Sequence, residues 1–149
     1  MWALLRPDAE AVLKDKRARA SLGRYFAVMQ DEKPAKFLVA KKVPAEFDDD
    51  DSTEELWQKH ENLTLEFHEI EGEIDAKRLS LKDMSAPEKS YLDLKIEIAN
   101  RILSSCHFCT RRCKVNRRKG EVGTCKCGTE ITVSSIFEHV GEEPELVPS

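Results

Sequence analysis

The decisive stretch of this chain reads CHFCTRRC at residues 106–113 and is completed, after a basic loop, by CKCG at residues 125–128. All five cysteines of the protein fall within this window, and the rest of the chain contains none. Soft thiolates in a tetrahedral array select zinc or an iron–sulfur cluster over hard cations. The spacing therefore predicts a metal site, where the metal either takes part in chemistry or only stabilises a small, loop-rich fold.

The composition is that of a globular chain of about one domain, because 35% of the 149 residues are charged and 40% are hydrophobic. No apolar run approaches the roughly 20 residues that span a bilayer, so no membrane association is expected. The first residues, MWALLRPD, lack the basic region and the long apolar core of a signal peptide. An odd number of clustered cysteines without a secretion signal favours a reducing compartment, and we expect a cytoplasmic protein.

Basic residues are concentrated around the cysteines. Between residues 101 and 128, eight Lys and Arg stand against one Glu, although the whole chain has a net charge of −4. A basic surface of this kind binds nucleic acid or an anionic cofactor. Cations beside a group of thiolates also offset its negative charge and keep the thiols ionised. Both interpretations stay open for the basic loop 111–119.

Amphipathic helices are predicted over most of the first hundred residues. Pro7 and Asp8 open a helix, residues 21–23 interrupt its apolar pattern, and a short second helix follows. The apolar run at residues 37–40 is consistent with a strand or with a buried extended segment. Residues 43–51, which contain a proline and four consecutive acids, are typical of a solvated connector.

Two long helices are predicted next, each beginning at a capping box, STEE at residues 52–55 and SAPE at residues 85–88. Apolar residues recur after each box at three- and four-residue steps, so the two helices should pack as an antiparallel hairpin. His60 and His68 lie on the first of them. Neither has a partner at metal-ligand spacing, so we expect each to be an ordinary packed or surface residue.

The predicted fold class is α-rich, mainly α with a small β and loop metal-binding module. Alternation of apolar and polar residues over 130–137 predicts a strand, and a tail of glutamates and prolines follows it. We expect residues 1–105 to form a helical leader that contains the hairpin. Residues 106–149 are expected to form a cysteine-rich, ribbon-like module with the C-terminal strand and tail.

Three segments resemble the start of a known protein family. They are C-x2-C-x-R-x-C-x-V-N-R at residues 106–117, K-G-E-x-G-x-C at residues 119–125 and H-x-G-E-E-P at residues 139–144. In order and spacing they are similar to radical S-adenosylmethionine proteins related to pyruvate formate-lyase-activating enzymes, and the helical leader resembles archaeal members more loosely. The chain departs from the family pattern at Thr110, where proline is common, and at Lys114, where glycine is common. Neither change removes a ligand.

The resemblance implies a metal site and a catalytic core outside this sequence. The implied metal ligands are Cys106, Cys109, Cys113 and Cys125, with the additional Cys127 as the alternative. In such proteins the G-E-E-P segment leads into a strand bearing C-x3-C-x2-C, which holds a [4Fe–4S] cluster that binds S-adenosylmethionine. The sequence stops at Ser149, before that motif, so we expect this chain alone to be non-catalytic and its partner to be the radical S-adenosylmethionine domain. The candidates for charge compensation, or for docking that domain, are Arg111, Arg117 and Arg118.

The rival interpretation is a self-contained zinc ribbon that binds nucleic acid or protein. Residues 106–109 would then form one knuckle, residues 125–128 the other, and the basic loop 111–119 would contact phosphates. The scarcity of aromatic residues in that loop weakens the case for single-stranded nucleic acid, which stacks on aromatic side chains. A thiol redox enzyme is disfavoured, because no thioredoxin-like pattern of strand and helix precedes the cysteines.

Overall fold

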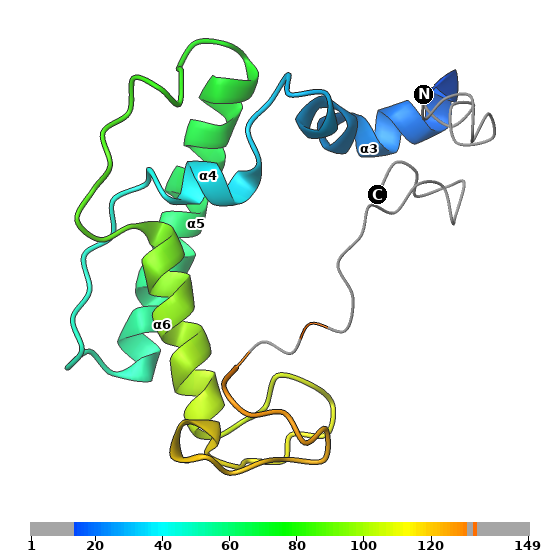
Figure 1. Cartoon of the computed structure of the whole chain (residues 1–149). Coiled ribbons are helices and arrows are strands. Elements are labelled where there is room, and N and C mark those ends of the chain that lie inside the picture. Colours follow the sequence, from blue (N-terminus) through cyan, green and yellow to red (C-terminus); the bar gives the residue numbers. More distant parts are fainter. Residues whose placement is uncertain (1–13, 131–132, 134–149) are drawn as a thin grey trace. The chain divides into compact units, whose positions relative to one another are not determined.

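A computed structural model describes residues 14–130 and residue 133 of the chain (Figure 1). Over these residues the protein is mainly α-helical, with four α-helices, one short 3-10 helix and no strand. The described residues fall into two compact units, 14–35 with residue 133, and 36–130. None of the described helices is long and apolar enough to cross a membrane.

The first unit contains α3 (Lys16–Met29). The carboxylate of Asp15 caps this helix by accepting hydrogen bonds from two backbone N–H groups of the first turn, at 2.8 Å each. Leu22 has a non-helical φ of −113°, which kinks the helix. The kink confirms the interruption predicted at residues 21–23. The helix start predicted at Pro7 lies outside the described residues.

The second unit opens with α4 (Lys36–Ala40), so the strand or extended segment predicted at residues 37–40 is wrong. One helical turn places Val39 and Ala40 in the core and leaves Phe37 exposed. A strand would need a neighbouring strand for its N–H and C=O groups, and the described residues provide none. A helical turn satisfies part of these groups within the segment itself.

Two longer helices follow, α5 (Thr53–Asp75) and α6 (Tyr91–Ser104). The capping box predicted for α5 is confirmed. The Ser52 hydroxyl accepts from the N–H of Glu55 at 3.2 Å, and the Glu55 carboxylate accepts from the N–H of Ser52 at 2.7 Å. These bonds lower the pKa of Glu55. Figure 1 shows α5 and α6 packed against each other, with the chain running in opposite directions.

The start of α6 differs from the prediction. The sequence placed a capping box at residues 85–88, but the box is formed by Ser90 and Asp93, whose carboxylate accepts from the N–H of Ser90 at 2.8 Å. The segment before it is extended, because the N–H of Tyr91 donates to the carbonyl of Val43 at 2.8 Å. A helix that began at residue 85 would break this bond, so α6 begins at Tyr91.

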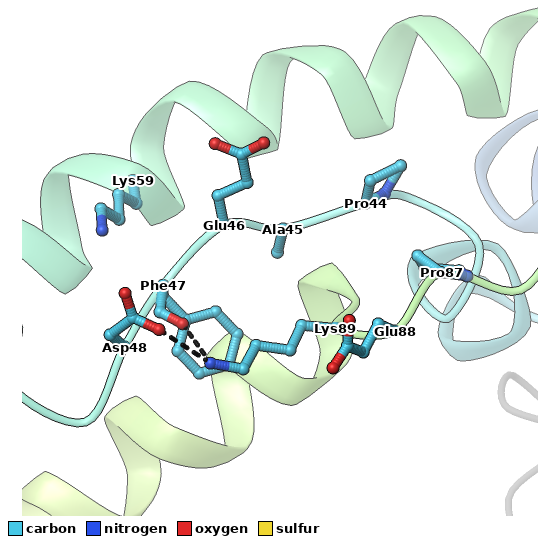
Figure 2. A pocket seen from close by; sticks show the side chains of 9 residues that line it. All are labelled: Pro44, Ala45, Glu46, Phe47, Asp48, Lys59, Pro87, Glu88 and Lys89. Carbon is cyan, nitrogen blue, oxygen red and sulfur yellow. Dashed lines mark hydrogen bonds and ion pairs between the residues drawn. The ribbon is translucent and has the colours of Figure 1, made fainter.

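The connector 43–51 is part of the core. Its buried side chains alternate along the segment: Val43, Ala45 and Phe47. Lys89 holds the connector in place, because its Nζ donates to the carbonyl of Phe47 and pairs with the carboxylate of Asp48 at 3.2 Å (Figure 2). The same Nζ lies 4.9 Å from the centroid of the Phe47 ring. The prediction of a solvated connector holds for Asp48, Asp49 and Asp50, which are exposed. Asp51 is partly buried and pairs with Lys59, and the apolar residues pack with period two, as in an extended segment.

The core of the second unit lies between α4, α5, α6 and the connector. Leu56 of α5 and Leu94 of α6 are 0% exposed, and Tyr91 is 2% exposed. Burial of a side chain of this size is worth about 1.5–3 kcal/mol. These few side chains therefore supply much of the free energy that holds the unit together.

We expect Leu94→Ala to destabilise the protein by about 2–5 kcal/mol, because it opens a cavity in a packed core. Leu65→Ala is the matched control, since Leu65 lies on α5 with 69% exposure. It should change the free energy of unfolding by no more than about 0.5 kcal/mol. Urea denaturation followed by circular dichroism measures both. Equal effects of the two substitutions would contradict this description of the core.

Candidate metal centre

The cysteine segment begins directly after the last turn of α6. Cys106 is 4% exposed. Its N–H donates to the carbonyl of Val115 at 3.0 Å, and its carbonyl accepts from the N–H of Lys114 at 2.9 Å. This pair of bonds closes residues 106–115 into a loop whose two ends meet. The position of Cys113 is thereby set relative to Cys106.

Three residues next to cysteines have a left-handed backbone. The φ angles are 41° at Arg112, 61° at Lys114 and 58° at Lys126. Residues other than glycine rarely adopt such angles, since the Cβ atom then crowds the following carbonyl oxygen. The chain turns sharply at these points, which flank Cys113 and follow Cys125.

The 3-10 helix η1 (Arg117–Lys119) positions Arg117. The side chain of Asn116 caps η1 by accepting from the N–H of Lys119 at 3.1 Å, and Gly120 ends it with a φ of 81°. The two residues that follow Arg117 are exposed, whereas Arg117 itself is only 6% exposed. One arginine of the basic loop is therefore directed inward.

The guanidinium of Arg117 contacts three of the four predicted ligands. Its Nε donates to Sγ of Cys106 at 3.0 Å. Its Nη2 lies 3.1 Å from Sγ of Cys125 and 3.8 Å from Sγ of Cys113. Its Nη1 donates to the carbonyl of Cys127. One buried cation thus gathers sulfur atoms from both ends of the cysteine segment.

The other two cysteines lie outside this cluster of sulfurs. Cys109 is exposed, and its side chain makes none of the contacts with Arg117 that the three others make. Cys127 is exposed as well, and its thiol donates to the carbonyl of Cys125 at 3.4 Å. In the described part of the chain, no three Cys, His, Asp or Glu side chains are grouped so as to hold a metal ion. The assignment of the four ligands stays a prediction.

Hydrogen bonds to sulfur favour the thiolate form at two positions. The pKa of Cys106 is lowered, chiefly by Arg117 and then by the N–H of Phe108. The pKa of Cys125 is lowered, chiefly by the N–H of Cys127 and then by Arg117. The pKa of Cys127 is raised, because its thiol shares a hydrogen bond with the sulfur of Cys125. Since a metal ligand must be deprotonated, Cys106 and Cys125 are the thiols best prepared for that role.

The thiolate ligands suit a soft metal ion, but the guanidinium of Arg117 occupies the place among the sulfurs that the ion would take. Thiolates prefer zinc or iron–sulfur clusters, and backbone N–H groups already point at two of the sulfurs. In the arrangement observed, the guanidinium of Arg117 supplies the positive charge that a metal ion would otherwise supply. Coordination by all four predicted ligands requires Arg117 to withdraw from the sulfurs and Cys109 to turn toward them.

Among the described residues, no histidine belongs to the cluster of sulfurs. His60 and His68 lie on α5, the first partly buried and the second exposed. His107 is exposed, and its Nδ1 lies 2.8 Å from the carbonyl of Ser105. The predicted strand at 130–137 falls almost wholly outside the described residues.

Gly123 is the site residue that sequence reasoning missed. A Cβ atom at this position would lie 2.4 Å from Sγ of Cys113 and 3.0 Å from Nη2 of Arg117. Only a residue without a side chain lets the backbone pass so close to Cys113. An isolated glycine two residues before a cysteine was the available signal, because such a glycine often marks a close approach of the backbone.

We expect Gly123→Ala to displace Cys113 and Arg117 at a cost of about 1–3 kcal/mol, the usual range for an overpacked site. Alkylation of Cys113 by iodoacetamide, followed by mass spectrometry, should become faster. Gly128→Ala is the control in the same segment, since a Cβ there meets nothing within 4 Å. An unchanged alkylation rate in Gly123→Ala would show that Gly123 does not pack on Cys113.

Comparison with known proteins finds a relative of this chain but shows no family. No family model matches the chain. No solved structure matches it either. The chain is 40% identical over 128 residues to a protein of Methanocaldococcus jannaschii that carries the description "Uncharacterized protein MJ0674". The aligned part is 86% of this chain and 35% of the relative, so the chain spans about a third of the length of the protein it matches.

Proposed function

We propose that the cysteine segment is a metal-binding module that holds zinc or an iron–sulfur cluster through Cys106, Cys109, Cys113 and Cys125. The observation that carries this proposal is the convergence of three of these sulfurs on Arg117. Such an arrangement brings three potential thiolate ligands from distant positions of the segment to one place. A ribbon-like module is supported by the loop closed at residues 106–115 and by a turn in which the N–H of Lys126 donates to the carbonyl of Gly123 at 2.9 Å.

The basic residues compensate the charge of this module. Four thiolates and one Zn²⁺ carry a net charge of about −2, which is costly to bring close to the core unless cations lie nearby. Arg117 is already hydrogen-bonded to the sulfurs. Arg111 and Arg118 lie nearby in the sequence and are exposed. Closure of the ligands around a metal requires Arg117 to withdraw to the edge of the sulfurs, where its charge still offsets that of the thiolates.

We further propose that the chain is the N-terminal portion of a radical S-adenosylmethionine enzyme related to pyruvate formate-lyase-activating enzymes, of archaeal type. Three segments in the right order and spacing support this. On this proposal the helical leader with its antiparallel hairpin and the cysteine module support a catalytic domain that binds S-adenosylmethionine on its own [4Fe–4S] cluster. The protein is then cytoplasmic.

A zinc ribbon that binds nucleic acid or protein is the second candidate. One observation favours it: the thiol of Cys127 lies beside Cys125 and could replace Cys113 as the fourth ligand. The basic side chains of the loop also point to solvent, where phosphates can reach them. The exposed ones are Arg111, Arg112, Lys114, Arg118 and Lys119.

Serine substitutions of single cysteines distinguish the two candidates. We expect Cys113→Ser to lose the bound metal and Cys127→Ser to retain it, because only the first removes one of the four proposed ligands. Anaerobic purification with elemental analysis measures the metal content, and colour separates an iron–sulfur cluster from zinc. The reverse result favours the ribbon. Full metal content in both variants, and also in Cys106→Ser, would refute the metal site.

We expect this chain alone to release no 5′-deoxyadenosine from S-adenosylmethionine. Radical chemistry needs an iron with one open coordination position, and four thiolates leave none. The test is anaerobic incubation of the reconstituted chain with a strong reductant and S-adenosylmethionine, followed by chromatography. Steady release of 5′-deoxyadenosine would show that this module is itself the catalytic cluster.

A further inference from the structure

A cavity of about 390 Å³ lies between α4, α5 and α6, away from the cysteine segment. Its apolar lining includes Phe67 of α5 and Tyr91 of α6, which are 7% and 2% exposed, and Ala40 of α4, which is 5% exposed. Phe37 lines the same cavity and is 53% exposed. Small-molecule sites are concave, mostly apolar and 300–1,000 Å³ in volume, as a rough range. This cavity has the size and lining of such a site.

Polar groups converge in the cavity from α5 and α6. Nζ of Lys95 donates to Nε2 of His60 at 2.9 Å and lies 4.2 Å from the centroid of the Tyr91 ring. The hydroxyl of Thr64 donates to the carbonyl of His60 at 2.7 Å, and it lies 2.6 Å from the hydroxyl of Tyr91. These bonds join two helices, so the groups are held in fixed positions.

The protonation state of His60 follows from this geometry. An ammonium group only donates hydrogen bonds, so Nε2 of His60 must accept the bond from Lys95, and the ring is neutral. Burial and then the charge of Lys95 lower the pKa of His60, in agreement with this state. The positive charge at this side of the cavity therefore belongs to Lys95 alone.

The lining of the cavity is positively charged, although the carboxylates of Glu61 and Glu71 stand nearby. Among the described residues that line it are two lysines, Lys36 and Lys95, and no carboxylate. Glu71 stands nearby, where its carboxylate pairs with Lys36 at 3.5 Å and with His68 at 3.3 Å. One lysine is thus compensated by a carboxylate, whereas Lys95 is bonded to a neutral ring. The net charge that faces the cavity suits one negative group.

The hollow beside the connector makes a useful contrast. It has a volume of about 630 Å³ and is lined by Lys89, which also lies over an aromatic ring (Figure 2). There, however, the lysine is already paired with Asp48 and with the carbonyl of Phe47. An anion that binds there would have to compete with Asp48 for Lys89. The cavity at Lys95, in contrast, combines an apolar lining with a lysine that contacts a neutral imidazole and an aromatic ring.

We propose that the cavity between α4, α5 and α6 binds a small amphipathic anion, a compound with a flat apolar body and one carboxylate. The body would lie against the apolar lining, of which the ring of Phe37 is the most exposed part and Phe67 and Tyr91 form the floor. The carboxylate would pair with Lys95. Contact of an aromatic body with these rings adds a directional preference to the burial of apolar surface. This site is independent of the proposed metal module.

Titration with 1-naphthoate, followed by calorimetry and by the NMR shifts of the His60 ring, tests the proposal. We expect saturable binding that shifts the His60 resonances. The cation 1-naphthylmethylamine should bind at least about tenfold more weakly, because it meets Lys95 with like charge; tenfold corresponds to 1.4 kcal/mol. Lys95→Met should weaken naphthoate binding by about the same factor.

Lys89→Met is the matched control, since Lys89 also lies over an aromatic ring but faces the other hollow. It should leave naphthoate binding unchanged, and Lys95→Arg should preserve it, because the charge remains. Circular dichroism confirms that each variant is folded. The proposal is overturned if naphthoate fails to saturate the protein, if the amine binds equally well, or if Lys95→Met and Lys89→Met behave alike.

Discussion

The hydrogen bond from the N–H of Tyr91 to the carbonyl of Val43 fixes the start of α6, and much of the second unit depends on it. This bond links the extended connector 43–51 to α6 at Tyr91, whose ring is buried in the core. Because α6 is a single unbroken helix of 14 residues, its start also determines where its last turn delivers Cys106. The core, the cavity beside Lys95 and the cysteine loop are therefore positioned by one element.

The sequence was sufficient for the features that rest on local signals. The predominance of helix, the capping box at Ser52 and the break near Leu22 follow from periodicity, side-chain capping and a glycine, all readable over a few residues. The errors, at residues 37–40, in the connector 43–51 and at the start of α6, came from tertiary contacts. A box at 85–88 is locally as good as one at Ser90, and the pairing with Val43 decides between them.

The candidate site was predictable in its residue types and less so in its arrangement. Cysteines that cluster in the sequence predict a shared site, and three of the four predicted sulfurs do contact the same arginine, Arg117. Arg117 was one of three arginines with similar local sequence, and only the cap at Asn116 turns this one inward. The closeness of Gly123 to Cys113 depends on how the loop folds back, which spacing alone does not reveal.

The left-handed backbone at Lys114 has a consequence for sequence variation. A lysine pays about 1–2 kcal/mol for this conformation, whereas glycine adopts it freely. Lysine at this position therefore keeps the turn and gives up some stability relative to glycine. In evolutionary terms, glycine and asparagine are the replacements that this backbone accepts most readily, and β-branched residues are those it excludes.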